Sequence, residues 1–189
     1  AALTALALAA MALVLRPGVE VEPEVARRVA YIRGHLAAWR LGWMVWMAAA
    51  IALTGFYAWW GARARNGRLA LLAVLAAGVG LAFDLVGESL YAAWLPELAN
   101  EDFEVMQRLG TLLTSAGANT LYTAAGVALT LATPGLGRAE RAVAWTAWAA
   151  GAALTVAGVL DHATGMAAAS GVLFPAVVLL CLLVGRRLR

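Results

Sequence analysis

The sequence predicts an all-α integral membrane protein, with six transmembrane helices and one short amphipathic helix at the membrane interface. Of its 189 residues, 63% are hydrophobic and only 13% are charged, whereas soluble domains carry about 25% charged residues. Apolar runs of roughly 20 residues, the length that crosses a bilayer, recur along the chain between short loops. Little room remains for a soluble domain, so we expect a single transmembrane domain over residues 1–189.

The composition narrows the class of function. The net charge of +3 comes from arginine alone, because the chain has no lysine. With so few charges outside the apolar runs, we interpret this surplus as a signal of membrane topology and not as a nucleic-acid-binding surface. The only cysteine, Cys181, excludes an intrachain disulfide and a thiolate zinc motif. The high alanine and glycine content indicates a bacterial source.

Each predicted helix has a start and a stop in the sequence. The first apolar run ends at Arg16-Pro17-Gly18, since proline and glycine both interrupt helices. A helical apolar stripe then begins near Pro23 and predicts an amphipathic interfacial helix over about residues 24–38. The transmembrane segments are expected at about residues 1–15, 41–61, 69–95, 107–133, 142–160 and 167–185.

The loop charges predict the topology. Arginine-rich turns at residues 63–68, 138–141 and 186–189 alternate with an acidic loop at residues 96–104. Arginine is enriched on the cytoplasmic side of membrane proteins. We therefore expect a multi-pass protein of the cell membrane with both termini in the cytoplasm and residues 16–38 outside.

The third predicted span carries three polar residues on one face. Asp84, Glu88 and Tyr91 are spaced i, i+4, i+7, which aligns them along a helix. A carboxylate at the centre of a spanning helix costs ~2.5–3.5 kcal/mol even on the lenient insertion scale. Two such groups one turn apart therefore need sheltering partners, and we expect other helices to supply them.

The fourth predicted span supplies such partners. Its polar residues keep to one side at helical spacing, and counting from the outer ends pairs Asp84 with Asn119, Glu88 with Ser115 and Tyr91 with Thr111 or Arg108. We expect an outward-facing pocket between the third, fourth and fifth spans. Asp161, Arg33 and Trp43 are expected at its mouth. The predicted ligand-binding residues are Asp84, Glu88, Tyr91, Arg108, Ser115, Asn119 and Tyr122.

Three functions fit this pattern. The leading hypothesis is binding or transport of a small solute or cation, with Asp84 and Glu88 carrying the charge. The first alternative is an intramembrane enzyme acting on a lipid-like substrate by acid–base or metal chemistry, with a divalent metal held by His35, Glu88 and His162. However, the sequence has no His-Glu-x-x-His or Gly-x-Ser-x-Gly motif. The second alternative is docking of a membrane partner subunit or a second copy of the chain.

In size, in its six predicted spans and in the Ala-x-x-x-Ala spacing of Ala1, Ala5 and Ala9, the chain resembles the substrate-binding subunits of energy-coupling-factor vitamin transporters. The resemblance is one of architecture, because no binding motif of that family carries over residue by residue. It implies a small-molecule ligand held among the helices.

Overall fold

A computed structural model describes residues 1–98 and 100–188. The chain is 88% helical, and the described residues form no strand, as the predicted all-α class requires. Three π-helical segments (η1, η3 and η5) and two short 3-10 segments (η2 and η4) extend or join the α-helices. The elements are α1 (Ala2–Ala10), η1 (Met11–Leu15), η2 (Arg16–Gly18), α2 (Val25–Gly34), α3 (Leu36–Gly61), α4 (Gly67–Ser89), η3 (Leu90–Trp94), η4 (Leu95–Glu97), α5 (Asn100–Thr111), η5 (Leu112–Ala118), α6 (Asn119–Ala132), α7 (Arg138–Val159) and α8 (Ala163–Arg187).

Four helical runs are long and apolar enough to cross a membrane: Leu36–Gly61, Gly67–Glu97, Arg138–Val159 and Ala163–Arg187. They correspond to four of the six predicted spans, and the other two are not confirmed. The predicted span at residues 1–15 falls in the apolar run Ala2–Gly18, which is shorter than the four. The predicted span at residues 107–133 falls in the run from α5 to α6, which begins with a strongly charged helix.

The faces of α4 show which environment the bundle suits. Its outer face exposes large apolar side chains, with Leu72, Leu75 and Val79 each more than half exposed. Its inner face buries the small residues Ala73 and Ala77. This distribution is the reverse of a soluble helix, and a continuous exposed apolar surface is what lipid contact requires.

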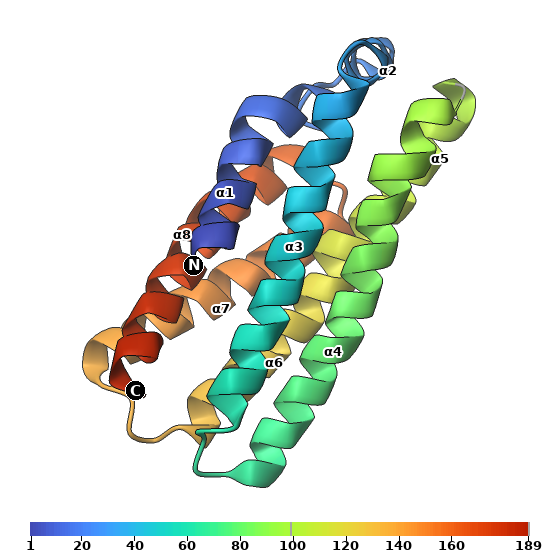
Figure 1. Cartoon of the computed structure of the whole chain (residues 1–189). Coiled ribbons are helices and arrows are strands. Elements are labelled where there is room, and N and C mark those ends of the chain that lie inside the picture. The colour runs from blue at the N-terminus through green and yellow to red at the C-terminus, as the bar shows by residue number, and fades with distance from the viewer. Residues whose placement is uncertain (99, 189) are drawn as a thin grey trace.

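The helices form an elongated bundle with short turns at its lower end in Figure 1. There the Arg65 amide donates a 3.0 Å hydrogen bond to the Ala132 carbonyl, which ties the α3–α4 turn to the end of α6. Asn66 caps α4 by accepting a 3.2 Å hydrogen bond from the Leu69 amide. Asparagine is one of the residues preferred at this N-cap position. At the opposite end, α2 crosses over the bundle and is seen nearly end-on.

The predicted interfacial helix at residues 24–38 is shorter than expected. α2 ends at Gly34, and the chain breaks at His35, whose φ of −128° and ψ of 32° are not helical. α3 then starts at Leu36, five residues before the predicted start of the second span. The expected stripe on α2 does face inward, because Val29 and Ile32 are buried.

Small residues let the helices approach closely. A Cβ added at Gly126 would overlap the ring of Trp148, and one added at Gly151 would overlap the Thr123 side chain. At these two glycines a side chain of the partner helix lies directly against the backbone of α6 or α7, in the manner of small-residue contacts in membrane helices. Gly80 also brings α4 near the junction of η5 and α6, since its Cβ would lie 3.2 Å from both the Ala118 carbonyl oxygen and the Leu121 Cβ.

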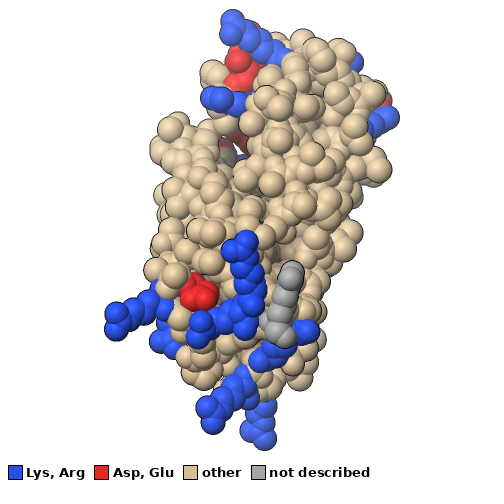
Figure 2. All heavy atoms as spheres, turned by 60° about the vertical axis from the view of Figure 1, so that its left-hand side comes forward, with Lys and Arg blue, Asp and Glu red and all other residues tan. Residues whose placement is uncertain are grey.

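Charge is confined to the two ends of the molecule in Figure 2, with a broad uncharged band between them. The lower end is dominated by arginine, and the upper end mixes arginine with acids. The same view shows a hollow below the upper end, with acidic atoms visible inside it.

Candidate binding cavity

The hollow leads into a cavity of about 450 Å³ in the upper half of the bundle. α1, α3, α4, α7 and α8 line it, together with the run from α5 to α6. All three π-helical segments also contribute, through Met11 of η1, Tyr91 of η3 and Ser115 of η5. Such segments widen a helix by one residue in a turn and occur often at functional sites. Here they redirect side chains around one shared space.

Two carboxylates of α4 reach this cavity. Asp84 is half-buried, and Glu88 is only 2% exposed. The Glu88 Oε2 atom has no hydrogen-bond partner among the described residues. A buried charge without a partner is costly, and a buried polar atom of this kind calls for an explanation such as a bound ligand or ion.

Aromatic rings form much of the cavity wall. Trp43 stacks on Tyr91 with ring centroids 4.4 Å apart and planes within 7°. Trp46 meets Phe174 of α8 edge to face at 4.9 Å. Tyr57, Tyr122 and Trp148 complete the set deeper in the bundle. The indole nitrogens of Trp43 and Trp46 and the hydroxyl of Tyr122 have no hydrogen-bond partner among the described residues.

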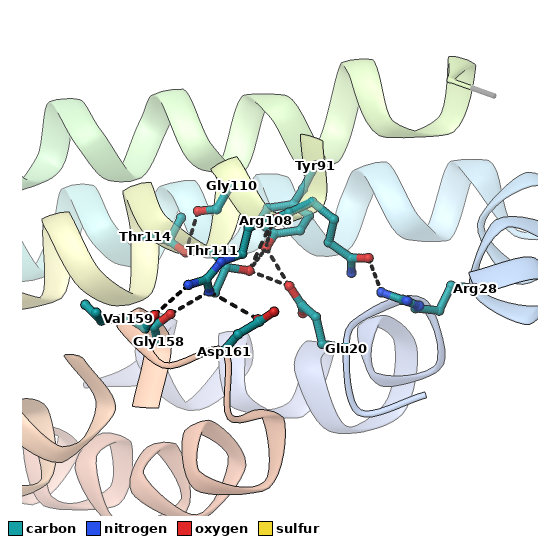
Figure 3. Close-up of polar contacts among 11 residues, drawn as sticks. Glu20, Arg28, Tyr91, Arg108, Gly110, Thr111, Thr114, Gly158, Val159 and Asp161 are labelled. Atoms are coloured by element: carbon teal, nitrogen blue, oxygen red, sulfur yellow. Dashed lines mark hydrogen bonds and ion pairs between the residues drawn. The ribbon is translucent and has the colours of Figure 1, made fainter. Parts of the chain in front are cut away.

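A polar network closes one side of the cavity (Figure 3). The Tyr91 hydroxyl lies 2.7 Å from Thr111 Oγ1, 3.2 Å from the Gln107 carbonyl oxygen and 3.4 Å from Glu20 Oε1. The Thr111 hydroxyl also donates to Glu20. These contacts join the segment after η2 to η3 and α5, so Glu20 extends along the cavity wall from a loop.

A second contact fixes α2 over the same region. The buried Arg28 donates to the side-chain oxygen of Gln107, and the Gln107 amide donates a 3.4 Å bond to the Gly18 carbonyl. Arg28 also lies over the ring of Phe103, 5.7 Å from its centroid. The guanidinium therefore holds α2 against α5 and covers the upper end of the bundle.

The structure brings most of the predicted ligand-binding residues to one cavity. Asn119 lines this cavity, and its side-chain amide nitrogen donates hydrogen bonds to the Gly151 carbonyl at 2.6 Å and to Thr155 Oγ1 at 2.9 Å. Of the residues predicted at the mouth, Trp43 lines it as well. The predicted residues that line the cavity are Asp84, Glu88, Tyr91, Ser115, Asn119, Tyr122 and Trp43.

Arg108, Asp161 and Arg33 are not among the lining residues. Arg108 instead donates 2.6 Å bonds to the carbonyls of Gly158 and Val159 and pairs with Asp161 at 3.1 Å. Arg33 donates to the Leu98 carbonyl at 2.8 Å. Both arginines donate to backbone carbonyls where helices end. Counting residues from the outer end of each span, as in the sequence analysis, could not foresee these contacts.

The residues predicted to hold a metal do not converge. His35 stacks on Tyr31 with ring centroids 4.4 Å apart, while His162 caps α8 by accepting a 3.0 Å bond from the Gly165 amide. Both histidines are exposed at helix ends, and Glu88 is buried. No group of three or more His, Cys, Asp or Glu side chains within the described part of the chain could hold a metal ion.

Several lining residues were not among the predicted site residues. Trp46 lies three residues after Trp43 on the same helical face, and this spacing is a signal that could have placed it in the wall. Trp39, on the same face, is instead buried and donates to the Tyr91 carbonyl at 2.8 Å. Glu20 carries no local signal, because acids in a loop are ordinarily solvated. The remaining unpredicted aromatic residues are Tyr57, Trp148 and Phe174.

A second depression lies at the arginine-rich end, where Arg65, Asn66 and Arg68 are among its lining residues. All three are exposed, so water already solvates their polar groups. The upper cavity is the better candidate site because it surrounds a buried and unpaired carboxylate.

Over the described residues, the fold and the cavity define an all-helical protein with four helices long and apolar enough to cross a membrane and an internal cavity lined by three acids and several aromatic rings. No protein-family model, curated protein or solved structure matches the chain.

Proposed function

We propose that this chain is a multi-pass membrane protein that binds a small solute or cation in the upper cavity, as a receptor or as part of a transport cycle. One observation carries the proposal: the cavity encloses Glu88, whose Oε2 atom is buried without a partner. A ligand that contacts this atom would offset the cost of burying it. The volume of about 450 Å³ lies in the range of small-molecule sites, ~300–1,000 Å³.

We further propose that the chain crosses the membrane six times, with both termini in the cytoplasm. In this topology the four apolar runs supply four crossings. The other two are made by α1 with η1 and by the run from α5 to α6. The arginines at the lower end of Figure 2 support this orientation, because they gather on one end of the bundle. The cavity, which lies toward the other end, would then open to the outside.

The test is a ligand screen on the protein reconstituted in lipid nanodiscs, with vitamins and divalent cations as the first panel. A ligand held through Glu88 should raise the melting temperature of the wild type and raise that of Glu88→Gln much less. Glu140→Gln is the matched control, since Glu140 lies near Arg187 at the arginine-rich end (3.7 Å between the charged atoms) and does not line the cavity.

A second variant tests the location without altering charge. Gly171 lines the cavity, and a Cβ added there meets no heavy atom within 4 Å. Gly171→Leu should therefore narrow the cavity and weaken binding. Gly185→Leu on the same helix is also free of contacts but is not a lining residue, so it should bind normally. Equal binding by both variants would contradict the proposed site.

A further inference from the structure

We propose that the ligand of this cavity is an organic amine in its protonated form, held by Glu88 and enclosed by aromatic rings. This inference rests on the proposed function and narrows the class of ligand. Three features carry it: the sign of the charge in the cavity, the aromatic lining around that charge, and the size of the space.

The charge lining the cavity is predominantly acidic. Asp84, Glu88 and Glu20 contribute carboxylates, and Arg16 is the one basic lining residue. Arg16 is exposed, whereas Glu88 is buried and Asp84 and Glu20 are half-buried. The acids therefore dominate the interior. A cation placed beside them favours their ionised form and is attracted by it, whereas an anion disfavours that form.

The carboxylate is also a directional acceptor. An ammonium N–H donated to Glu88 Oε2 would form a charge-assisted hydrogen bond, which is roughly twice as strong as a neutral one. Because this oxygen has no other partner among the described residues, the bond would replace nothing within the protein. A neutral alcohol could also donate to it, but without the attraction between opposite charges.

The aromatic wall favours an organic cation over a bare ion. Rings of Trp, Tyr and Phe attract a cation through their faces, and tryptophan does so most strongly. Trp43 and Trp46 line the cavity next to Tyr91 and Phe174. A divalent metal ion prefers an oxygen or nitrogen cage, whereas the described residues hold no group of three such ligands. The cavity wall therefore suits a ligand that has an apolar organic part as well as a positive charge.

The space is large enough for an amine with a substantial apolar part. The cavity volume of about 450 Å³ is many times the ~30 Å³ of a water molecule. An inorganic ion would leave most of the aromatic wall unfilled. An amine with an aryl or alkyl group would place its nitrogen near Glu88 and its apolar part against the rings.

The experiment compares three probes of similar shape that differ in charge: phenethylamine, phenethyl alcohol and hydrocinnamate. Their affinities are measured by calorimetric titration into nanodisc-embedded protein at neutral pH, with protein-free nanodiscs as the blank. We expect the amine to bind about tenfold more tightly than the alcohol, and hydrocinnamate to bind least. In Glu88→Gln the amine should lose this advantage, while the alcohol keeps its wild-type affinity.

A variant of the wall tests the aromatic contribution. Trp46→Leu keeps an apolar side chain but removes the ring, so it should weaken the amine more than the alcohol. The alcohol also reports whether the variant is folded, since its binding needs the same cavity.

The outcomes separate this inference from the proposed function. If the alcohol or the acid binds as tightly as the amine, or if the advantage of the amine survives in Glu88→Gln, the ligand class is wrong. If a neutral solute from the screen binds and is blocked by Gly171→Leu while no amine binds, the cavity is a binding site but not one for amines. If no probe or screened compound binds, both proposals fail.

Discussion

At the scale of single residues, Glu88 is the side chain whose burial costs the most free energy without an evident structural benefit. Glu88 is buried on α4, and one of its oxygens lacks a partner among the described residues. An apolar side chain would serve stability better at this depth, since a buried polar group without a partner costs free energy that an apolar group does not. Glu88 is therefore better explained by ligand binding than by folding.

This argument predicts the stability of Glu88→Gln without ligand. We expect the substitution to change stability by at most about 1 kcal/mol, because a buried carboxyl without a cation beside it avoids the cost of its charge by keeping its proton, and the amide of Gln is neutral and of similar size. Thermal unfolding in nanodiscs at neutral pH measures the change. Glu140→Gln, which breaks a partly exposed ion pair with Arg187, should cost at most ~1 kcal/mol. A marked loss of stability in Glu88→Gln would point to a structural role.

Two tyrosines of the cavity should respond differently to loss of their hydroxyl groups. The Tyr91 hydroxyl contacts Thr111 and the Gln107 carbonyl, so Tyr91→Phe should cost about 1–2 kcal/mol. The Tyr122 hydroxyl makes no hydrogen bond of good geometry among the described residues, and Tyr122→Phe should cost less than Tyr91→Phe. Chemical denaturation of the two variants side by side checks this, and equal effects would contradict the network in Figure 3.

At the scale of the helices, glycine sets how near α6 and α7 can lie. Gly126→Ala would push a methyl group into the ring of Trp148, whose nitrogen donates a 3.0 Å bond to Thr130. We expect a loss of about 1–3 kcal/mol, as for overpacking elsewhere. Gly55→Ala on α3 is the control, because its Cβ meets nothing within 4 Å. There the change should be neutral or stabilising by ~0.5–1 kcal/mol.

The end of α7 depends on a side chain from α5. Arg108 donates to the carbonyls of Gly158 and Val159, which lie at the end of α7. Arg108→Gln should lower the melting temperature, because these terminal carbonyls lose their donor. Asp161→Asn removes only the charge of a partner that is largely exposed, and should cost less than ~1 kcal/mol. If both variants lose equal stability, the ion pair and not the helix end is the important contact.

At the scale of the whole molecule, the arginines on one end predict the orientation in the membrane. In a Cys181→Ala background, Gly67→Cys marks the arginine-rich end and Leu160→Cys marks the other; both positions are exposed. We expect an impermeant thiol reagent added to intact cells to label Leu160→Cys only. Labelling of Gly67→Cys from outside would reverse the proposed topology and place the opening of the cavity in the cytoplasm.

The all-helical class and the four runs that are long and apolar enough to cross a membrane could be predicted from the sequence, because long apolar segments have few alternative structures in lipid. Asp84, Glu88 and Tyr91 could be aligned on one face by helical spacing alone. The other two predicted spans are not confirmed, since the run at residues 107–133 overlaps the charged α5 and the run at residues 1–15 is short.

Contacts between distant segments could not be read from periodicity. Arg108 was expected in the pocket and instead binds the end of α7, while Glu20 reaches the cavity from a loop. The π-helical segments at Met11–Leu15, Leu90–Trp94 and Leu112–Ala118 shift each helical face by one residue in a turn. A regular 3.6-residue repeat does not foresee such shifts.

By itself, the sequence determined that the protein is helical, that apolar side chains cover its surface, and that two acids of one helix need shelter. These follow from hydrophobicity and helical spacing, which act locally along the chain. Only the tertiary structure decided which helices shelter the acids, that Trp43 and Trp46 line the same cavity, and that the two histidines do not converge with Glu88. Those arrangements depend on how neighbouring helices pack and which backbone groups need partners, and both are properties of the folded molecule.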